Sequence, residues 1–420
     1  MPTQLQNLEA VTRQMQENEI VQQYNDEALF LNNFVDRKPG KWVNGKGYQI
    51  SSNFVPDPSH AYISEGGANP AGGSNEFANM YVGYTRYRKT IDLSNDALDD
   101  LLNGNQDVQL SFAEKVQNVT SSAIRELEEA CWGDGTGIKA VVGSGSTTTS
   151  IVLTTTPTTT PFTSKGSEFL YKNVVYDWYN SSGTLQESNI TASAVTKGTS
   201  PTLTPASTLS GSPSSTDILV IAGSYNKVHR GMRYLYANGS GLKQGLLQST
   251  YDELKTPQLD LAGSPLQPSD VLRLRNRIRY RSGVKSGKGM MIVGSITQLE
   301  AYQRTGFNFL QLNVGQPWDG VVNKATMGGV TPMELTTCDE DTLWFINGDD
   351  IGKIEKMPWG FISTKSGQTW FQKSGSNGTG SDGQYAVMGT NINLYTKKPN
   401  SGGVIVRASV TGLSTSSNSR

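Results

Sequence analysis

Residues 107–132 carry the most regular hydrophobic pattern in the chain. The apolar residues recur at steps of three and four, and this spacing places side chains on one face of an α-helix. They are Val108, Phe112, Val116, Val119, Ala123, Leu127 and Ala130. A helix of this length would extend about 40 Å at about 1.5 Å per residue. We expect it to end at the glycine-rich turn 133–137, because glycine readily takes the left-handed conformation that closes a helix.

Two excursions are predicted before this helix. Residues 48–87 are rich in Gly, Asn, Ser and Pro, yet residues 81–87 alternate in the way that is typical of a β-strand. We therefore expect a long β-hairpin, and an excursion of this length usually contacts a partner. Residues 5–34 have apolar side chains at roughly helical spacing among Gln, Asn and Glu. This helical arm has too little apolar surface to stand alone, so we expect it to lie on something else, such as a neighbouring subunit.

Local signals predict several shorter elements. A helix should begin at Ser94 and end at Gly104, because Ser is a favoured N-cap and Gly a favoured stop. Ser269 is expected to cap a second helix, and residues 296–304 to form a third. Buried strands are predicted at 217–223, 290–293, 343–346, 385–388 and 404–406.

Residues 141–216 differ in composition from the rest of the chain. No charged residue occurs from 140 to 164, where Thr and Ser runs surround a short apolar segment. A second Ser/Thr/Pro-rich run covers 199–216, and an aromatic cluster at 169–179 lies between the two runs. A flexible linker would not account for the aromatic cluster. We therefore predict a small all-β insertion with Ser/Thr-rich loops.

The charge balance argues against a protein whose whole surface binds nucleic acid. The formal net charge is -1, whereas neutralising phosphates requires a marked excess of Lys and Arg. A local exception is the strip formed by Arg273, Arg275, Arg277, Arg279 and Arg281, at every second position. The Ser-Asp pair just before the strip favours a helix there. Three interpretations stay open: a contact with DNA, an arginine-to-carboxylate contact between subunits, and a solvated face.

No residue pattern predicts catalysis or zinc binding. His60 and His229 have no carboxylate at ligand spacing, and Cys131 and Cys338 have no zinc-type spacing. We expect the histidines to be structural or surface residues and the cysteines to be bystander thiols. Residues 1–20 lack the apolar core of a secretory signal, and no segment reaches the length of a membrane span. Synthesis in the cytosol and no membrane contact are therefore predicted.

The glycine-rich and acidic segments also fail as ligand sites. The turn 133–137 follows a helix, which is the reverse of a dinucleotide-binding context, and 283–288 lacks the phosphate-loop spacing. The acidic groups 338–341 and 349–350 lack the calcium-loop pattern, so we predict that they are solvated turns. The sequence therefore predicts no enzyme, no metal site and no cofactor.

Five pieces between residues 61 and 137 occur in a recognisable order and spacing. They are Ile-Ser-Glu-Gly-Gly-Ala-Asn-Pro at 63–70, Tyr-Arg-Lys-Thr-Ile-Asp-Leu-Ser at 87–94, Ala-Leu-Asp-Asp-Leu at 97–101, the long helix, and the glycine turn. Together they resemble the tailed-bacteriophage major capsid protein family, which has the Hong Kong 97 fold. A weaker likeness continues through 290–304, 343–355 and 385–407.

The resemblance implies an α+β fold of the Hong Kong 97 type, with a long spine helix, an extended β-hairpin loop and, in this chain, the small all-β insertion. The implied parts are an N-terminal arm 1–47, the extended loop 48–92, a peripheral domain with the spine helix 93–140, the insertion 141–216, an axial domain 217–330, peripheral return strands 331–375, and C-terminal strands with a tail 376–420.

The implied function is structural. A major capsid protein self-assembles into hexamers and pentamers that form an icosahedral shell around the double-stranded DNA of the phage. Such a chain is part of the virion and assembles in the host cytoplasm. Implied partners are other copies, a portal protein, a separate scaffolding protein and packaged DNA bound without sequence preference, while a decoration protein is left open. The candidate subunit-contact residues are Trp42, Phe54, Tyr62, Glu65, Phe77, Tyr81, Arg86 and Arg88, and the arginine strip is a candidate for contact with a subunit or with DNA.

Two other functions stay open. An encapsulin-like nanocompartment shell of the same fold would enclose an enzyme rather than a genome. An extracellular β-rich adhesin or glycan binder is suggested by the Ser/Thr content and by exposed aromatics such as Trp178, although an export signal is missing. Some family members link a loop lysine covalently to an asparagine of a neighbour. No Lys or Arg lies between Lys46 and Arg86, so we predict no such cross-link.

Overall fold

The computed structural model describes most of the chain and divides it into two compact units. The described residues are 30–31, 42–55, 62–64, 67–68, 76–94, 106–154, 169–198, 200–282, 290–302, 327, 330, 332–364, 367–374 and 380–408. Among these, the first unit contains 30–31, 84–131 and 353–394, and the second contains 42–83, 132–352 and 395–408. The predicted arm helix 5–34 and the short helix 94–104 lie almost wholly outside the described residues.

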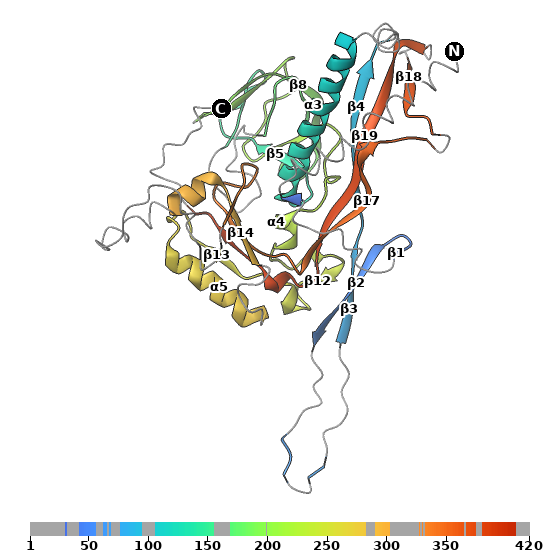
Figure 1. Ribbon diagram of the computed structural model, residues 1–420. Helices are drawn as coiled ribbons and strands as arrows, with labels where there is room; N and C mark the ends of the chain where they lie inside the picture. Colours follow the sequence, from blue (N-terminus) through green and yellow to red (C-terminus); the bar gives the residue numbers. More distant parts are fainter. Residues whose placement is uncertain are drawn as a thin grey trace, which may run out of the picture. The chain divides into compact units, whose positions relative to one another are not determined.

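The first unit consists of the long helix α3 (Gln106–Cys131) and a four-stranded sheet (Figure 1). The strands are β4 (Thr85–Leu93), β17 (Ile351–Phe361), β18 (Trp370–Ser374) and β19 (Gly380–Thr396), and the other three strands all pair with β19. The predicted apolar stripe faces the core, where Phe112, Val116, Ala123 and Leu127 are buried. The ring of Phe112 lies 5.9 Å from that of Trp370. The long amphipathic helix is therefore confirmed.

The predicted glycine-rich turn follows α3, which ends at Cys131, but Gly133 beside the helix end does not have a positive φ angle, so a left-handed glycine does not cap the helix. Gly135 and Gly137 have φ angles of 94° and 81°, in the region that other residues avoid. A Cβ at Gly137 would lie 2.8 Å from Cγ2 of Val228, so this turn also needs the missing side chain for space.

The second unit has a five-stranded sheet in the order β13-β20-β16-β14-β15. These strands are β13 (Gln258–Asp260), β20 (Gly403–Val406), β16 (Leu343–Asn347), β14 (Met290–Gly294) and β15 (Met333–Glu334). Helix α5 (Pro268–Ser282) packs on this sheet, with Leu274 and Ile278 in one core with Ile292, Phe345 and Ile405. A further helical segment covers the described residues 296–302. Three predicted buried strands, now β14, β16 and β20, are confirmed.

Residues 138–221 form a six-stranded sheet in the order β5-β10-β7-β8-β9-β6, and four of its strands, β6 to β9, lie within the predicted insertion 141–216. The strands are β5 (Ile138–Val141), β6 (Ile151–Val152), β7 (Val175–Tyr179), β8 (Leu185–Thr196), β9 (Thr202–Pro205) and β10 (Ile218–Ile221). The all-β prediction is confirmed. The expectation that Trp178 is exposed is wrong, because this indole is 5% exposed and its Nε1 donates to Oδ2 of Asp217 at 2.8 Å. This removes the aromatic argument for an adhesin.

The remaining elements of the second unit are short or extended. They are β1 (Trp42–Val43), β2 (Gly47–Val55), β3 (Glu76–Val82), α4 (Met232–Leu235), β11 (Leu242–Lys243), β12 (Leu246–Leu247), η3 (Asp252–Leu254) and η4 (Pro399–Ser401). The segment predicted as one strand at 81–87 is divided between β3 and β4, and the two strands belong to different sheets. The alternating pattern did not reveal this change of sheet, because alternation continues in β4.

Two further predictions need correction. Helix α5 begins at Pro268, and Oδ2 of Asp270 accepts the N–H of Gln267 at 3.2 Å, so Ser269 is not the residue that precedes the helix. The acidic group 338–341 is not a solvated turn, because Asp339 and Asp341 are buried. Cys131 and Cys338 are both buried, and no disulfide bond joins them.

Candidate assembly surfaces

The hairpin β2–β3 is antiparallel and continuous from the pair Tyr48 and Val82 to the pair Val55 and Glu76, with one register shift. One face of its base is buried, through Ile50, Ala78, Met80 and Val82. Alternation explains the pattern, because successive side chains of a strand point to opposite faces. The hairpin base is therefore a packed part of the second unit and not a free loop.

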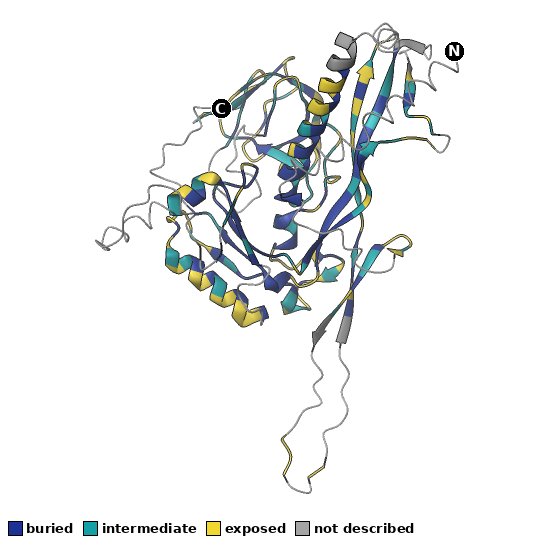
Figure 2. Ribbon diagram, in the orientation of Figure 1, coloured by how far each residue is buried: buried dark blue, intermediate teal, exposed yellow. Residues whose placement is uncertain are grey.

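Two hydrogen bonds fix the hairpin base to the rest of the second unit. The N–H of Tyr81 donates to the carbonyl oxygen of Gln244 at 2.8 Å, and Oγ of Ser52 donates to the carbonyl oxygen of Lys397 at 3.1 Å. Beyond the paired residues, Tyr62 is fully exposed and Ile63 is half-exposed at 50%. The contrast between buried base and exposed end is visible in Figure 2. Tyr62 and Ile63 are adjacent exposed apolar side chains, which makes this end of the hairpin a candidate contact surface.

The other hairpin candidates have mixed surroundings. Trp42 is 41% exposed, and its ring packs edge-on against that of Tyr48 at 5.1 Å. Tyr81 is half-buried, with Nζ of Lys46 at 5.2 Å from its ring centre. Phe54 and Phe77 lie on β2 and β3, but their side chains fall outside the described part, as does Glu65 altogether. The structure thus brings Trp42 and Tyr81 to one small sheet.

Arg86 and Arg88 lie on β4 in the first unit and not on the hairpin. Both are exposed, whereas Tyr87 between them is half-buried and points to α3. The guanidinium of Arg88 donates to the carbonyl oxygen of Thr390 at 2.9 Å and to Oδ1 of Asn391 at 2.7 Å. Burial and the neighbouring Arg86 lower the pKa of Arg88. Arg88 is therefore held in place by β19, while Arg86 remains at the surface.

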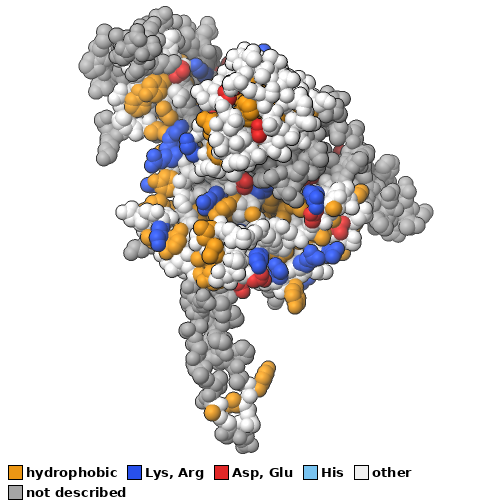
Figure 3. Space-filling view, turned by 180° about the vertical axis from the view of Figure 1, so that it is seen from behind, with side chains coloured by type: hydrophobic (Ala, Val, Ile, Leu, Met, Phe, Trp, Pro, Cys, Tyr) orange, Lys and Arg blue, Asp and Glu red, His pale blue; other side chains and the backbone are white. Residues whose placement is uncertain are grey.

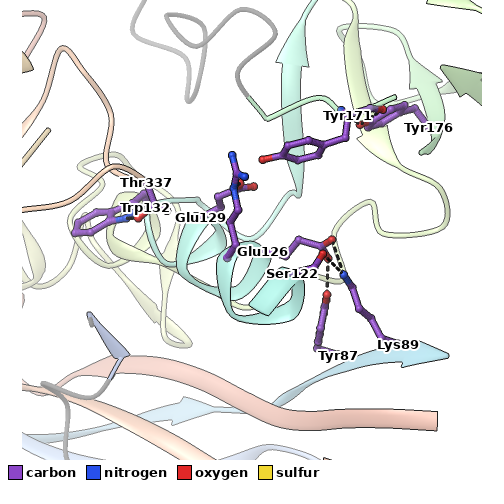
Figure 4. Close-up of polar contacts among 10 residues, drawn as sticks. Tyr87, Lys89, Ser122, Glu126, Glu129, Trp132, Tyr171, Tyr176 and Thr337 are labelled. Carbon is purple, nitrogen blue, oxygen red and sulfur yellow. Dashed lines mark hydrogen bonds and ion pairs between the residues drawn. The ribbon is translucent and has the colours of Figure 1, made fainter. Parts of the chain in front are cut away.

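The opposite face of β4 joins the sheet to α3 through polar contacts (Figure 4). Tyr87 donates its hydroxyl hydrogen to Oε2 of Glu126, and Nζ of Lys89 lies 3.1 Å from Oε1 of the same carboxylate. Nζ of Lys89 also donates to Oγ of Ser122 at 2.5 Å. Burial is the main cause that raises the pKa of Tyr87 above its ordinary value, so its hydroxyl stays a donor. These contacts orient β4 and leave alternate side chains on its other face.

Glu128 holds the only part of the first 37 residues that the structure describes. Its Oε1 accepts the N–H of Phe30 at 2.8 Å, and Phe30 and Leu31 are fully buried. Burial raises the pKa of Glu128, while the bonds from the two backbone N–H groups oppose that shift. Sequence analysis missed this residue. The available signal was its position four residues after Ile124, on the buried side of α3.

Helix α5 carries the arginine strip, so the helical alternative is confirmed. Its buried side consists of Val271, Leu274, Ile278 and Ser282. Four of the arginines are exposed and Arg275 is half-buried. Figure 3 shows Lys and Arg side chains gathered along the lower edge of the second unit, where α5 lies.

Buried polar groups form ion pairs and hydrogen bonds with one another inside the second unit. Nη2 of Arg233 lies 2.6 Å from Oδ2 of Asp339, and the pKa of Asp341 is raised by burial and by Asp339. Nζ of Lys243 donates to the carbonyl oxygen of Leu254 at 2.7 Å.

His229 is buried, whereas His60 lies outside the described residues. Within the part of the chain that the structure describes, no three His, Cys, Asp or Glu side chains gather as metal ligands. No described helix combines the length and apolar character needed to cross a membrane.

Comparison with known proteins identifies the fold. No family model and no curated protein matches the chain. The solved capsid asymmetric unit of cyanophage A-1(L) aligns over 92% of this chain and 93% of its own, with a TM-score of 0.52 and 9% identity. Mycobacterium phage Patience aligns over 94% and 88% of the two chains, with a TM-score of 0.42 and 9% identity. The holo-SrpI encapsulin complex of Synechococcus elongatus aligns over 80% and 79%, with a TM-score of 0.37 and 8% identity. The chain has the Hong Kong 97-type capsid fold that the sequence resemblance implied.

Proposed function

We propose that this chain is a major capsid protein, which assembles with its own copies into the icosahedral head shell of a tailed bacteriophage. The observation that carries the proposal is the alignment with a cyanophage capsid subunit over more than nine-tenths of both chains. A fold alone does not determine a function. The anchored hairpin with an exposed end supplies the second argument, because this surface is satisfied when another copy covers it.

A capsid protein that forms such a shell acts together with specific partners. Copies form hexamers and pentamers, and many weak repeated contacts between them add up through multivalency. A separate scaffolding protein guides closure, a portal protein occupies one vertex, and double-stranded DNA fills the shell. The subunits assemble in the host cytoplasm and end in the virion. The candidate contact residues of the hairpin, Trp42, Tyr62 and Tyr81, are proposed to lie between copies.

Assembly of the purified full-length chain tests the proposal. Negative-stain electron microscopy and sedimentation over a range of protein concentrations should show rings of five or six subunits, or closed shells. A uniform monomer at every concentration would contradict the proposal. Shells that co-purify with an enclosed enzyme and no nucleic acid would instead support the nanocompartment function.

The shell is proposed to be held by non-covalent contacts. The hairpin segment between Lys46 and Arg86 contains no lysine that could form an isopeptide bond. On a denaturing gel, mature particles should therefore yield one band at the mass of the single chain. A ladder of covalently linked subunits would overturn this part of the proposal.

A further inference from the structure

The outward side of α5 is a concentrated positive surface. Burial of Val271, Leu274 and Ile278 fixes the rotation of the helix on the sheet. The opposite side of the helix therefore faces solvent, and it includes the exposed Arg273, Arg277, Arg279 and Arg281. Figure 2 shows the two sides of α5 as separate exposed and buried stripes. A helix packed on one side and rich in arginine on the other presents fixed charges to a partner.

Little negative charge lies close enough to neutralise these arginines. Among the described residues, no ion pair is recorded for the four exposed ones. The nearby acids have other partners: Asp270 accepts the N–H of Gln267, Asp260 pairs with Arg407, and Asp252 lies 3.0 Å from Nζ of Lys255. Arg281 contributes only a weak stabilisation to the charged form of Asp252. The positive field of α5 is thus largely uncompensated within the chain.

The spacing of the arginines suits a regular polyanion. Arg273, Arg277 and Arg281 follow one another at four-residue steps, which are about 6 Å apart along a helix axis. A DNA duplex presents about one phosphate per 1.7 Å of its axis, so several phosphates face a stretch of about 12 Å. Arginine suits this contact because its planar group donates two parallel hydrogen bonds to phosphate oxygens.

Exposed side chains beside the arginines add to the case for a binding surface. Tyr280 is 93% exposed and Leu272 is 49% exposed. A tyrosine hydroxyl can donate to a phosphate oxygen, and tyrosine is among the residues that contact DNA backbones.

A second copy of this chain offers no comparable acidic strip in its described part. Asp339 and Asp341 are buried, and Asp252 is paired with Lys255.

We propose that the outward face of α5 binds the phosphate backbone of double-stranded nucleic acid without sequence preference. This inference rests on the proposed function, because a shell that encloses a genome has one face exposed to it. The binding is electrostatic and local. The chain as a whole has a formal net charge of -1, so the interaction is confined to this helix.

A duplex-binding assay with a charge-matched control tests the proposal. Full-length subunits are kept below their assembly concentration, verified by sedimentation, and titrated with a fluorescent 30-base-pair DNA of random sequence at several salt concentrations. The test variant replaces Arg273, Arg279 and Arg281 with Gln, because no hydrogen bond is recorded for these three among the described residues. The control variant replaces Lys172, Lys197 and Lys227, exposed on and beside the insertion, with Gln and removes the same charge.

The salt dependence separates a specific surface from general charge. Each phosphate contact contributes about 0.9 to the slope of log affinity against log salt, so the test variant should lose about 2 to 3 units of slope and about tenfold or more in affinity at low salt. The control should bind like the wild type, and replacement of the same three arginines with Lys should restore most of the slope. Equal losses in test and control variants, or no salt-dependent binding by the wild type, would overturn the proposal.

Assembly is scored in the same samples at higher concentration by electron microscopy. If the test variant binds DNA normally but no longer forms rings or shells, the strip contacts another subunit and the nucleic-acid proposal is wrong. If the wild type binds DNA through α5 but never assembles, the proposed function fails while this inference stands.

Discussion

The insertion and the hairpin are both excursions from the core, but only the insertion buries its own apolar surface. Tyr176 and Trp178 are buried inside the insertion sheet, and Asp217 accepts hydrogen bonds from the indole of Trp178 and from the N–H of Ser214. Beyond the hairpin base, in contrast, Tyr62 is fully exposed. Six strands can enclose a core, whereas a two-stranded ribbon cannot. The difference indicates which excursion depends on other copies.

The largest expected effect comes from shortening the hairpin. Deletion of residues 56–75 and insertion of Asn-Gly would join Val55 to Glu76, which already pair across the ribbon, through a favoured two-residue turn. The buried base and its bonds to Gln244 and Lys397 stay in place, so the subunit should fold. Assembly into rings or shells, measured by sedimentation, should be abolished because the exposed end is gone.

A graded version of this test keeps the length of the hairpin. Replacement of Tyr62 and Ile63 with Ser should reduce assembly without changing the thermal midpoint of the dilute subunit, since exposed positions contribute little to folding. The matched control is Leu185→Ser, which removes an exposed leucine from the insertion. Normal assembly of the shortened chain, or an equal defect in the Leu185 variant, would remove the distinction between the two excursions.

The features predicted well from the sequence are those encoded by neighbouring residues. The long helix follows from a seven-residue apolar stripe, and the insertion follows from an aromatic cluster between uncharged runs. The turn after the helix follows from glycines that take positive φ angles. Each signal lies within one element, so local periodicity was sufficient.

The features that were missed depend on contacts between distant residues. Arg233 and Asp339 are 106 positions apart, and the bond from Phe30 to Glu128 spans 98. A charged residue near a loop usually predicts a solvated turn, and the sequence gives no measure of what covers it. For the same reason, Trp178 was wrongly expected at the surface: its hydrogen-bond partner Asp217 lies 39 residues away in the sequence.

The candidate contact residues show the same division. The arginine strip was placed on a helix because a Ser-Asp pair precedes it, and the structure agrees. The assignment of Arg86 and Arg88 together with the hairpin did not anticipate that β4 pairs with β19, about 300 residues later in the chain. Pairing of strands over such a separation has no local signal.

The second prediction tests whether the insertion is self-contained. Trp178→Ala should destabilise the insertion by about 3 to 5 kcal/mol, because it creates a large cavity and removes an indole donor from the buried Asp217. Hydrogen exchange should show lost protection over residues 138–221 and unchanged protection in α5 and its sheet. Assembly should persist at low temperature. Loss of protection throughout the second unit would show that the insertion core is not separate.

The smallest expected effect concerns the anchor of the hairpin. Lys243 is 1% exposed at the end of β11, next to Gln244, whose carbonyl oxygen accepts the N–H of Tyr81. Burial lowers the pKa of Lys243 to about 7 from its ordinary 10.5. Between these two values the unfolded chain binds more protons than the folded one, so the free energy of unfolding rises with pH. The rise from pH 7 to pH 9 should be about 2 kcal/mol, at about 1.4 kcal/mol per unit.

Lys243→Met should flatten this part of the pH profile, because the ionisable amine is removed while an unbranched apolar chain still fills the space. The measurement is urea unfolding of the dilute subunit between pH 7 and pH 9, with Lys172→Met on the exposed side of the insertion as the matched change. The loss of the amine that donates to Leu254 opposes part of the gain at pH 7. An unchanged slope in the Lys243 variant would show that the buried amine beside the hairpin anchor does not cause the pH dependence of stability.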